Sequence, residues 1–173
     1  SKVSSAGGTP QSLTALDAQA GEVTQSWPQM LPGSKSVLFT SSTHTFDYYD
    51  DASIAVYSIA SGQRKTVQSG GFYARYLPSG HLAYIHTSTL FAVPFDLQRL
   101  TATGQPAPVL EGVHTMFQFG GAQFSFSETG NLAYVAGGGE RQKLSIYWMD
   151  REGKFTPLRE APGLYSNPAF SPD

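Results

Sequence analysis

Carboxylate and aromatic side chains gather in segment 43–51, Thr-His-Thr-Phe-Asp-Tyr-Tyr-Asp-Asp. Aspartate oxygens suit hard cations and tyrosine rings offer flat amphipathic contacts, so the segment has the groups to bind a cation, a sugar or a basic peptide. It lacks the ordered Asp-x-Asp-x-Asp-Gly spacing of a calcium loop. A solvated loop whose rings tuck against a sheet is the plainer interpretation. The candidate binding residues here are Phe46, Asp47, Tyr48, Tyr49, Asp50 and Asp51.

A second candidate group lies in segment 113–121, where His114, Phe117 and Phe119 stand close together. An exposed aromatic cluster is a plausible recognition surface. The alternative is that Phe117 or Phe119 belongs to a strand and is core. Tyr165 occupies a comparable place later in the chain and is a weaker member of the same set.

Catalytic patterns are missing from the sequence. It contains no Cys, no His-Glu-x-x-His and no Gly-x-Ser-x-Gly, which removes disulfides, thiol nucleophiles, the helical zinc motif and the serine nucleophile elbow. We therefore expect no catalytic residue, no cofactor and no metal site. A composite metal site, built from His44, His86 or His114 on different repeats, stays open as an alternative.

The charge and hydropathy patterns exclude two classes of partner. The formal net charge is -2 and no Lys/Arg cluster occurs, so the basic footprint of a nucleic-acid binder is absent. No apolar run approaches the roughly 20 residues that span a bilayer. Residues 1–10 are polar and lack the apolar core of a signal peptide. We expect neither nucleic acid as a partner nor a membrane span in this chain.

Short apolar or alternating runs bounded by Gly, Pro, Ser and Asp recur throughout, which predicts an all-β chain. Three segments align as strand, turn and strand, with turns at Pro32, Pro78 and Glu128, spaced by 46 and 50 residues. This period matches the roughly 40–50 residues of a four-stranded propeller blade. Leu82 and Tyr84, like Leu132 and Tyr134, alternate with smaller residues, as expected of strands packed between blades.

The repeat predicts β-propeller blades of four antiparallel strands, about three full blades with split strands at the ends. We place an outer strand of a preceding blade in 1–22, full blades in 23–69, 70–120 and 121–163, and the first strand of a following blade in 164–173. The expected strands are 10–16; 27–31, 36–42, 53–59 and 64–68; 72–77, 81–87, 89–95 and 106–111; 121–127, 131–136, 144–149 and 155–159; and 167–171.

Four segments resemble the TolB-type, WD-like propeller repeat: Asn167-Pro-Ala-Phe-Ser-Pro-Asp173, Gly130-Asn-Leu-Ala-Tyr134, Gly80-His-Leu-Ala-Tyr84 and Ser145-Ile-Tyr-Trp-Met-Asp150. Segment 89–113 is similar to the propellers attached to bacterial serine/threonine protein kinases. No Gly-rich phosphate loop or His-Arg-Asp catalytic loop accompanies it. The resemblance implies a sensor or interaction module outside the cytoplasm, in the periplasm or beyond.

Our first functional expectation is a non-catalytic module that binds a protein or a small ligand. The alternative is the propeller portion of an enzyme, either the gate of a prolyl-oligopeptidase-like hydrolase or a propeller lyase that uses His and metal. Because an open array exposes strand edges, we also expect a homo-oligomer or a fragment of a longer propeller. The loops that would choose a ligand are not specified by the repeat.

Overall fold

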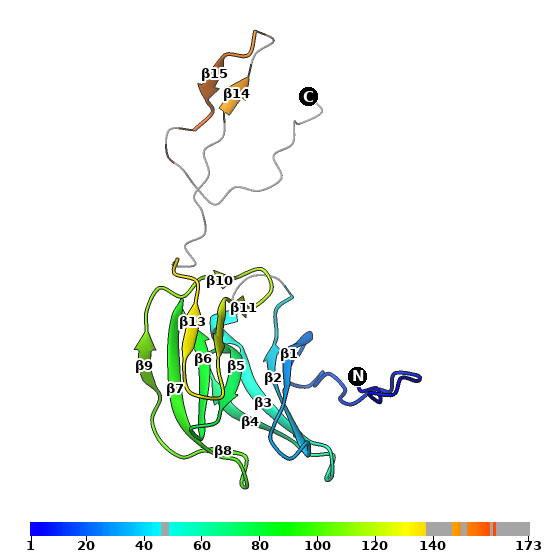
Figure 1. Ribbon diagram of the computed structural model, residues 1–173. Helices are drawn as coiled ribbons and strands as arrows, with labels where there is room; N and C mark the ends of the chain where they lie inside the picture. The colour runs from blue at the N-terminus through cyan, green and yellow to red at the C-terminus, as the bar shows by residue number, and fades with distance from the viewer. Residues whose placement is uncertain (46–48, 138–146, 150–151, 160, 162–173) are drawn as a thin grey trace. The chain divides into compact units, whose positions relative to one another are not determined.

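The computed structural model describes residues 1–45, 49–137, 147–149, 152–159 and 161 (Figure 1). The predicted fold class is confirmed: the chain is all-β, with antiparallel four-stranded sheets. The helical element of the described residues is one short 3-10 turn, η1 (Tyr49–Asp51). No helix in this part of the chain is long and apolar enough to cross a membrane. The chain divides into two compact units, Ser1–Gly139 and Glu140–Asp173.

The first sheet has the strand order β1-β2-β3-β4 and is antiparallel throughout. Its strands are β1 (Thr24–Met30), β2 (Ser36–Ser42), β3 (Ser53–Ser58) and β4 (Arg64–Ser69). Every residue of β2 is buried, because its Val, Leu and Phe side chains and its small hydroxyl residues are covered on both faces of the sheet. The outer strand β4 is largely polar and half-exposed, as suits a sheet edge.

The second sheet repeats this plan with β5 (Phe72–Leu77), β6 (His81–His86), β7 (Thr89–Asp96) and β9 (Ala107–Leu110). A short strand, β8 (Thr101–Ala102), pairs with the end of β7, and β9 pairs with the rest of it. Figure 1 shows the two sheets beside each other. The four strands expected between 72 and 111 are present, with β8 as an addition.

The third set of strands forms smaller sheets in the described residues. β10 (Thr115–Met116) pairs with β11 (Gly121–Ala122), and β12 (Phe124–Phe126) pairs with β13 (Leu132–Tyr134). In the second unit, β14 (Tyr147–Met149) pairs with β15 (Phe155–Pro157). The strand expected at 167–171 lies outside the described residues. The division into blades at 23, 70, 121 and 164 therefore stays a prediction.

Equivalent tight turns join the first two strands of each repeat. In each turn a backbone N–H donates to the carbonyl three residues earlier: Ser34 to Leu31, Gly80 to Leu77 and Gly130 to Ser127. The donors Ser34, Gly80 and Gly130 all have positive φ, between 54° and 88°. The spacing of the turns reproduces the 46- and 50-residue period of the sequence. Glycine tolerates this backbone conformation without the Cβ clash that Ser34 must accept.

Two hydrophobic clusters lie on opposite faces of the second sheet. Along β6, Leu82 and Tyr84 belong to the cluster shared with the first sheet, whereas Ala83 and Ile85 belong to the cluster shared with Val113, Ala122 and Phe124. Alternation along a strand sends successive side chains to opposite faces, so the middle sheet is buried on both. In the third repeat Leu132 is half-buried and Tyr134 is 45% exposed. The two alternating positions are therefore more buried in the second repeat than in the third.

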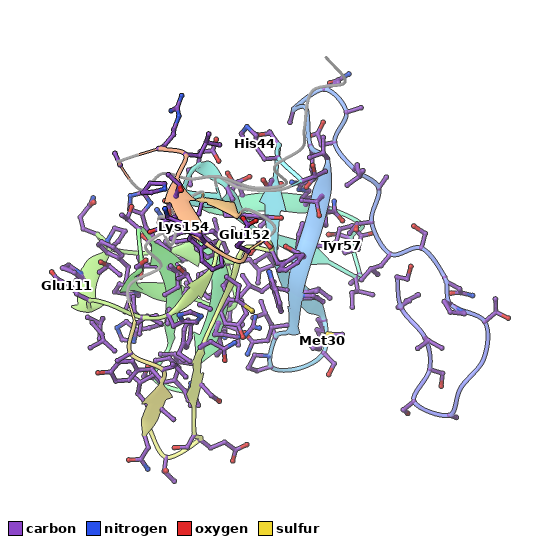
Figure 2. All side chains as sticks on the ribbon, turned by 90° about the horizontal axis from the view of Figure 1, so that it is seen from above. Met30, His44, Tyr57, Glu111, Glu152 and Lys154 are labelled. Atoms are coloured by element: carbon purple, nitrogen blue, oxygen red, sulfur yellow. The ribbon has the colours of Figure 1, made fainter. Side chains whose placement is uncertain are left out.

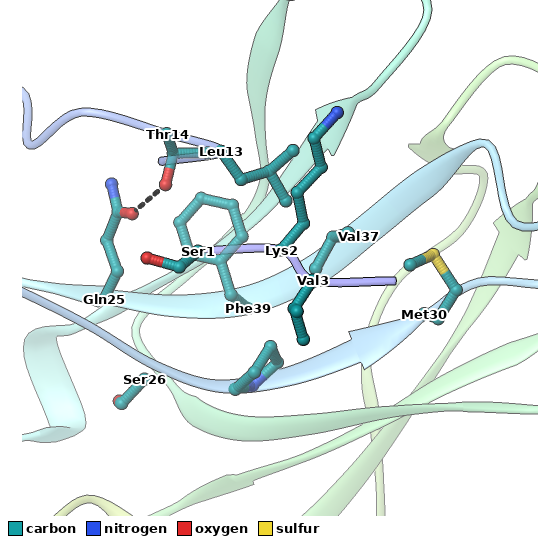
Figure 3. A pocket seen from close by; sticks show the side chains of 11 residues that line it. Ser1, Lys2, Val3, Leu13, Thr14, Gln25, Ser26, Met30, Val37 and Phe39 are labelled. Carbon is teal, nitrogen blue, oxygen red and sulfur yellow. Dashed lines mark hydrogen bonds between the residues drawn. The ribbon is translucent and has the colours of Figure 1, made fainter. Parts of the chain in front are cut away.

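The N-terminal segment contains no strand beyond an isolated bridge between Lys2 and Gln11. Its assignment as the outer strand of a preceding blade stays a prediction. Figure 3 shows Lys2 and Val3 near Val37 and Phe39 of β2, with the hydroxyl of Thr14 hydrogen-bonded to Gln25. Val37 and Phe39 are 8% and 5% exposed. The segment thus helps to line the face of the first sheet that looks away from the second.

Candidate functional site

We call the ten candidate binding residues predicted in the 43–51 loop, in segment 113–121 and at Tyr165 the loop face, and six of them belong to the described part of the chain. Phe46, Asp47, Tyr48 and Tyr165 lie outside the described residues. Tyr49 is only 4% exposed and packs against Phe72, with ring centroids 6.0 Å apart. Burial raises the pKa of the Tyr49 hydroxyl. Its side chain is therefore core, as the plainer interpretation of the 43–51 loop anticipated for its rings.

The two aspartates that follow Tyr49 make structural contacts. Asp50 Oδ1 accepts a 2.7 Å hydrogen bond from the backbone N–H of Thr87 and lies 4.0 Å from His86 Nδ1. Asp51 Oδ2 lies 3.5 Å from His44 Nδ1. Thr87 and Ser88 both have positive φ, so Asp50 holds a tight β6–β7 turn in place from the neighbouring sheet.

Phe117 and Phe119 lie in the hairpin between β10 and β11, and His114 directly precedes β10. His114 and Phe119 are exposed and Phe117 is half-buried. Phe119 is 55% exposed, and its carbonyl accepts a 2.7 Å hydrogen bond from Trp27 Nε1. The structure brings this hairpin to Tyr49 of the 43–51 loop, where Gly120 faces the Tyr49 ring. A Cβ on Gly120 would stand 2.3 Å from that ring, so only glycine fits.

The structure reveals an arrangement that sequence reasoning missed. Trp27 and Tyr73 meet edge to face at 5.1 Å, Tyr73 meets Phe124 at 5.3 Å, and Phe124 meets Phe126 at 5.7 Å. We call these four residues the aromatic row. It crosses from β1 through β5 to β12, the first strands of the three repeats. Trp27 and Tyr73 are 46 residues apart, as are Pro32 and Pro78. The equal spacing indicates that Trp27 and Tyr73 hold equivalent positions in neighbouring repeats.

A groove of about 470 Å³ opens along the same three strands. Gln29, Arg75 and Ser125 line it and hold the same place in their repeats, spaced by the 46 and 50 residues of the turns. We call it the inner-strand groove. The rest of its lining is Tyr73, Tyr76, Leu77, Pro78, Phe124, Phe126, Ser127 and Glu128.

Two polar side chains shape the groove wall. Gln29 links β1 to β5, because its Oε1 accepts from Tyr76 N at 2.7 Å and its Nε2 donates to Tyr76 O at 3.4 Å. The Arg75 guanidinium lies 4.1 Å from the centre of the Tyr73 ring. Its Nη1 donates to the carbonyls of Trp27 and Ala74, at 3.2 and 2.9 Å. The cation is thus fixed on an aromatic face at the groove.

The groove and the predicted loop face are different places. Met30 and His44, both labelled in Figure 2, mark opposite ends of the β1–β2 pair, since Met30 pairs with Val37 and Thr24 pairs with Ser42. The groove extends toward the turns at Pro78 and Glu128, whereas the loop face lies at the His44 end. Within the described ranges, no three His, Asp or Glu side chains are arranged to hold a metal ion.

Comparison with known proteins gives one structural match. No family model matches the chain, and no curated protein matches its sequence significantly. The fold is similar to a structure of a Mycobacterium tuberculosis puromycin-hydrolyzing peptidase, with a TM-score of 0.51 and 17% sequence identity. The match covers 81% of this chain and 22% of that one. The chain therefore spans about a fifth of the peptidase's length, and the likeness concerns the fold.

Proposed function

We propose that this chain is a non-catalytic recognition segment of a β-propeller, and that its ligand or protein partner binds in the inner-strand groove. The observation that carries the proposal is the convergence of Gln29, Arg75 and Ser125, from three repeats, on one groove beside the aromatic row. Concave sites with apolar walls and a few fixed polar groups are the usual form of ligand sites. The resemblance to TolB-type repeats supports a location outside the cytoplasm.

The backbone of the aromatic row supports the same site. Trp27 and Tyr73 have φ of 56° and 53°, a conformation that L-residues with large side chains rarely adopt. Both lie where the pairing register shifts, between Ser26 and Gln29 in β1 and between Phe72 and Arg75 in β5. Bulges of this kind re-aim side chains and are concentrated near functional sites.

A binding experiment tests the proposal against the loop face. The isotope-labelled chain is titrated with a set of N-acetylated aromatic amino acids, as free acids and as amides, and amide shifts are followed by NMR. We expect the shifts to cluster on β5 and β12. Shifts that cluster on the β10–β11 hairpin, or no shifts with any member of the set, would overturn the assignment.

A matched pair of variants sharpens the result. Phe126→Ala removes a half-buried ring from the groove wall, whereas Phe119→Ala removes an exposed ring from the loop face. We expect Phe126→Ala to weaken binding roughly tenfold, in the range of a lost aromatic contact, and Phe119→Ala to leave it unchanged. The reverse pattern would place the site on the loop face.

A second candidate function is the propeller portion of a larger hydrolase, favoured by the fold likeness to the puromycin-hydrolyzing peptidase. On this proposal the groove would contact a substrate whose chemistry happens on another domain. Hydrolysis of puromycin by a longer protein that contains this chain, lost when Arg75 and Phe126 are changed together, would support it. A longer protein with no hydrolase domain would exclude it.

We also propose that the chain associates with further blades, either of a longer protein or of other copies. The strand β1 stands at the edge of its sheet, and an unpaired strand edge is a template for association. Two exposed apolar side chains belong to this strand or directly precede it, Met30 at the end of β1 and Val23 just before its start. Light scattering of the 173-residue chain should give a mass above the monomer's 18.6 kDa; a folded monomer at high concentration would contradict self-association.

A further inference from the structure

Two arginines of this chain each lie over an aromatic ring but differ in their other partners. Arg64 lies over the Phe39 ring at 5.4 Å and forms a 2.6 Å ion pair with Glu22. Arg75 lies over the Tyr73 ring at 4.1 Å, yet the ion pairs of the described residues do not include it. Both side chains are partly buried. The fold thus supplies a carboxylate for one stacked guanidinium and not for the other.

The hydrogen bonds of Arg75 leave part of its guanidinium available. Nη1 donates to the carbonyls of Trp27 and Ala74, and the described residues place no acceptor on Nε or Nη2. A guanidinium has five N–H donors in a rigid fork that fits a carboxylate through two parallel hydrogen bonds. The two backbone bonds and the Tyr73 ring already fix the plane of this fork, so a ligand would meet a preorganised donor.

The residues that line the groove determine which chemical group can lie beside a carboxylate bound to Arg75. Tyr73, Phe124 and Phe126 line the groove, and aromatic rings favour apolar and aromatic groups. Glu128 stands at the rim toward the turn and is exposed. Its negative charge disfavours a second anion there, which limits the ligand to one carboxylate at the Arg75 end.

We propose that the inner-strand groove binds a ligand that ends in a carboxylate and carries an apolar or aromatic group beside it, such as the C-terminus of a peptide. The carboxylate is held by the Arg75 fork and the apolar group lies against the aromatic row. This inference rests on the proposed recognition function of the groove, to which it adds the chemical class of the ligand.

The test compares two probes on the unaltered chain. N-acetyl-phenylalanine and its amide differ only at the terminal group, so the difference in their dissociation constants isolates the carboxylate. We expect the acid to bind at least about tenfold more tightly, the effect of a charge-assisted hydrogen-bond pair. Equal binding of both probes in the groove would overturn the carboxylate inference and leave the recognition function standing. No binding of either probe would overturn both.

Variants locate the effect on one side chain. Arg75→Gln should abolish the preference for the acid, and Arg75→Lys should keep part of it, since an ammonium keeps the charge but not the fork. Arg99→Gln is the matched control, because Arg99 is 82% exposed and lies outside the groove; it should leave the preference intact. Glu128→Gln should tighten acid binding about twofold.

The measurements on the variants also distinguish a loss of folding from a loss of binding. Arg75→Gln removes donors to Trp27 and Ala74 and can disturb the strand, so each variant is first checked by circular dichroism and thermal unfolding. Arg75→Lys retains a donor at this place if Arg75→Gln does not fold. An acid preference that survives in a folded Arg75 variant as fully as in Arg99→Gln would overturn the role of Arg75.

Discussion

The Trp27 indole meets the Tyr73 ring edge to face, with ring centroids 5.1 Å apart and planes at 68°, although 46 residues separate them in the chain. Each residue has positive φ in the first strand of its repeat. Arg75 donates to the Trp27 carbonyl, and the indole donates to the Phe119 carbonyl. Because Tyr73 also meets Phe124 at 5.3 Å, the pair connects the first strands of three successive repeats.

Replacing Trp27 with Phe tests the indole hydrogen bond. The ring contact with Tyr73 should persist, but the Phe119 carbonyl would lose its 2.7 Å donor. We expect a loss of about 1–2 kcal/mol in the free energy of unfolding, from the lost hydrogen bond and the smaller ring, measured by urea titration. Phe119→Ala keeps the carbonyl and removes an exposed ring, so it should cost much less. Equal losses in the two variants would contradict this account.

Replacing Gly120 with Ala tests the approach of the β10–β11 hairpin to the Tyr49 ring. The new Cβ would stand 2.3 Å from that ring, at a residue whose φ is +60°. Overpacking and left-handed strain together should reduce the free energy of unfolding by about 3 kcal/mol. Gly80 has φ +79°, and no atom lies within 4 Å of a Cβ added there. Gly80→Ala therefore measures the backbone strain alone, which should cost about 1 kcal/mol. A Gly120 variant no less stable than the Gly80 variant would refute the close packing.

Replacing Asp50 with Ala tests the link between the η1 turn and the β6–β7 turn. The Thr87 N–H would lose its 2.7 Å acceptor, and we expect faster amide hydrogen exchange at Thr87 with about 1 kcal/mol of lost stability. Asp51→Ala is the control, because that carboxylate faces His44 and not the turn. Unchanged exchange at Thr87 in the Asp50 variant would show that the turn holds without this side chain.

The sequence predicts the strands of the first two sheets well, since β2 and β5 begin and end at the expected residues and the turns at Pro32 and Pro78 repeat at the blade period. Alternation and turn residues are local signals that strands follow closely. The all-β class with four-stranded sheets follows from them.

The candidate site was harder to anticipate. Tyr49 stands among loop carboxylates, and nothing in its neighbours in sequence shows that Gly120 leaves room for its ring. The role of Arg75 depends on two carbonyls and on a Tyr73 ring aimed by a bulge. Such contacts arise from how repeats pack, which the repeat period does not specify. Gln29 and Arg75 hold equivalent positions in their repeats, and a comparison of such positions would have indicated the groove.

Acid titration tests the ion pair between Glu22 and Arg64. Burial alone would raise the Glu22 pKa, but hydrogen bonds from Arg64, Ser41, the Asp17 backbone and Gln25 outweigh it and lower the pKa from 4.5 to about 2. Because the folded-state pKa is depressed, the stabilisation is fully present above the unfolded pKa of 4.5 and is lost as pH falls toward 2. The shift corresponds to roughly 3 kcal/mol.

The control variants assign this acid sensitivity to Glu22. We expect the free energy of unfolding, measured with urea between pH 6 and 2, to fall less steeply in Glu22→Gln than in the unaltered chain, because the amide cannot take up the proton. Glu22→Gln should also be less stable at pH 6, where it lacks the charge that pairs with Arg64 at 2.6 Å. Glu111→Gln, at an exposed carboxylate, should keep the original slope. A Glu22 variant with the same slope as the Glu111 variant would mean that other carboxylates govern acid unfolding and that the buried pair contributes little to it.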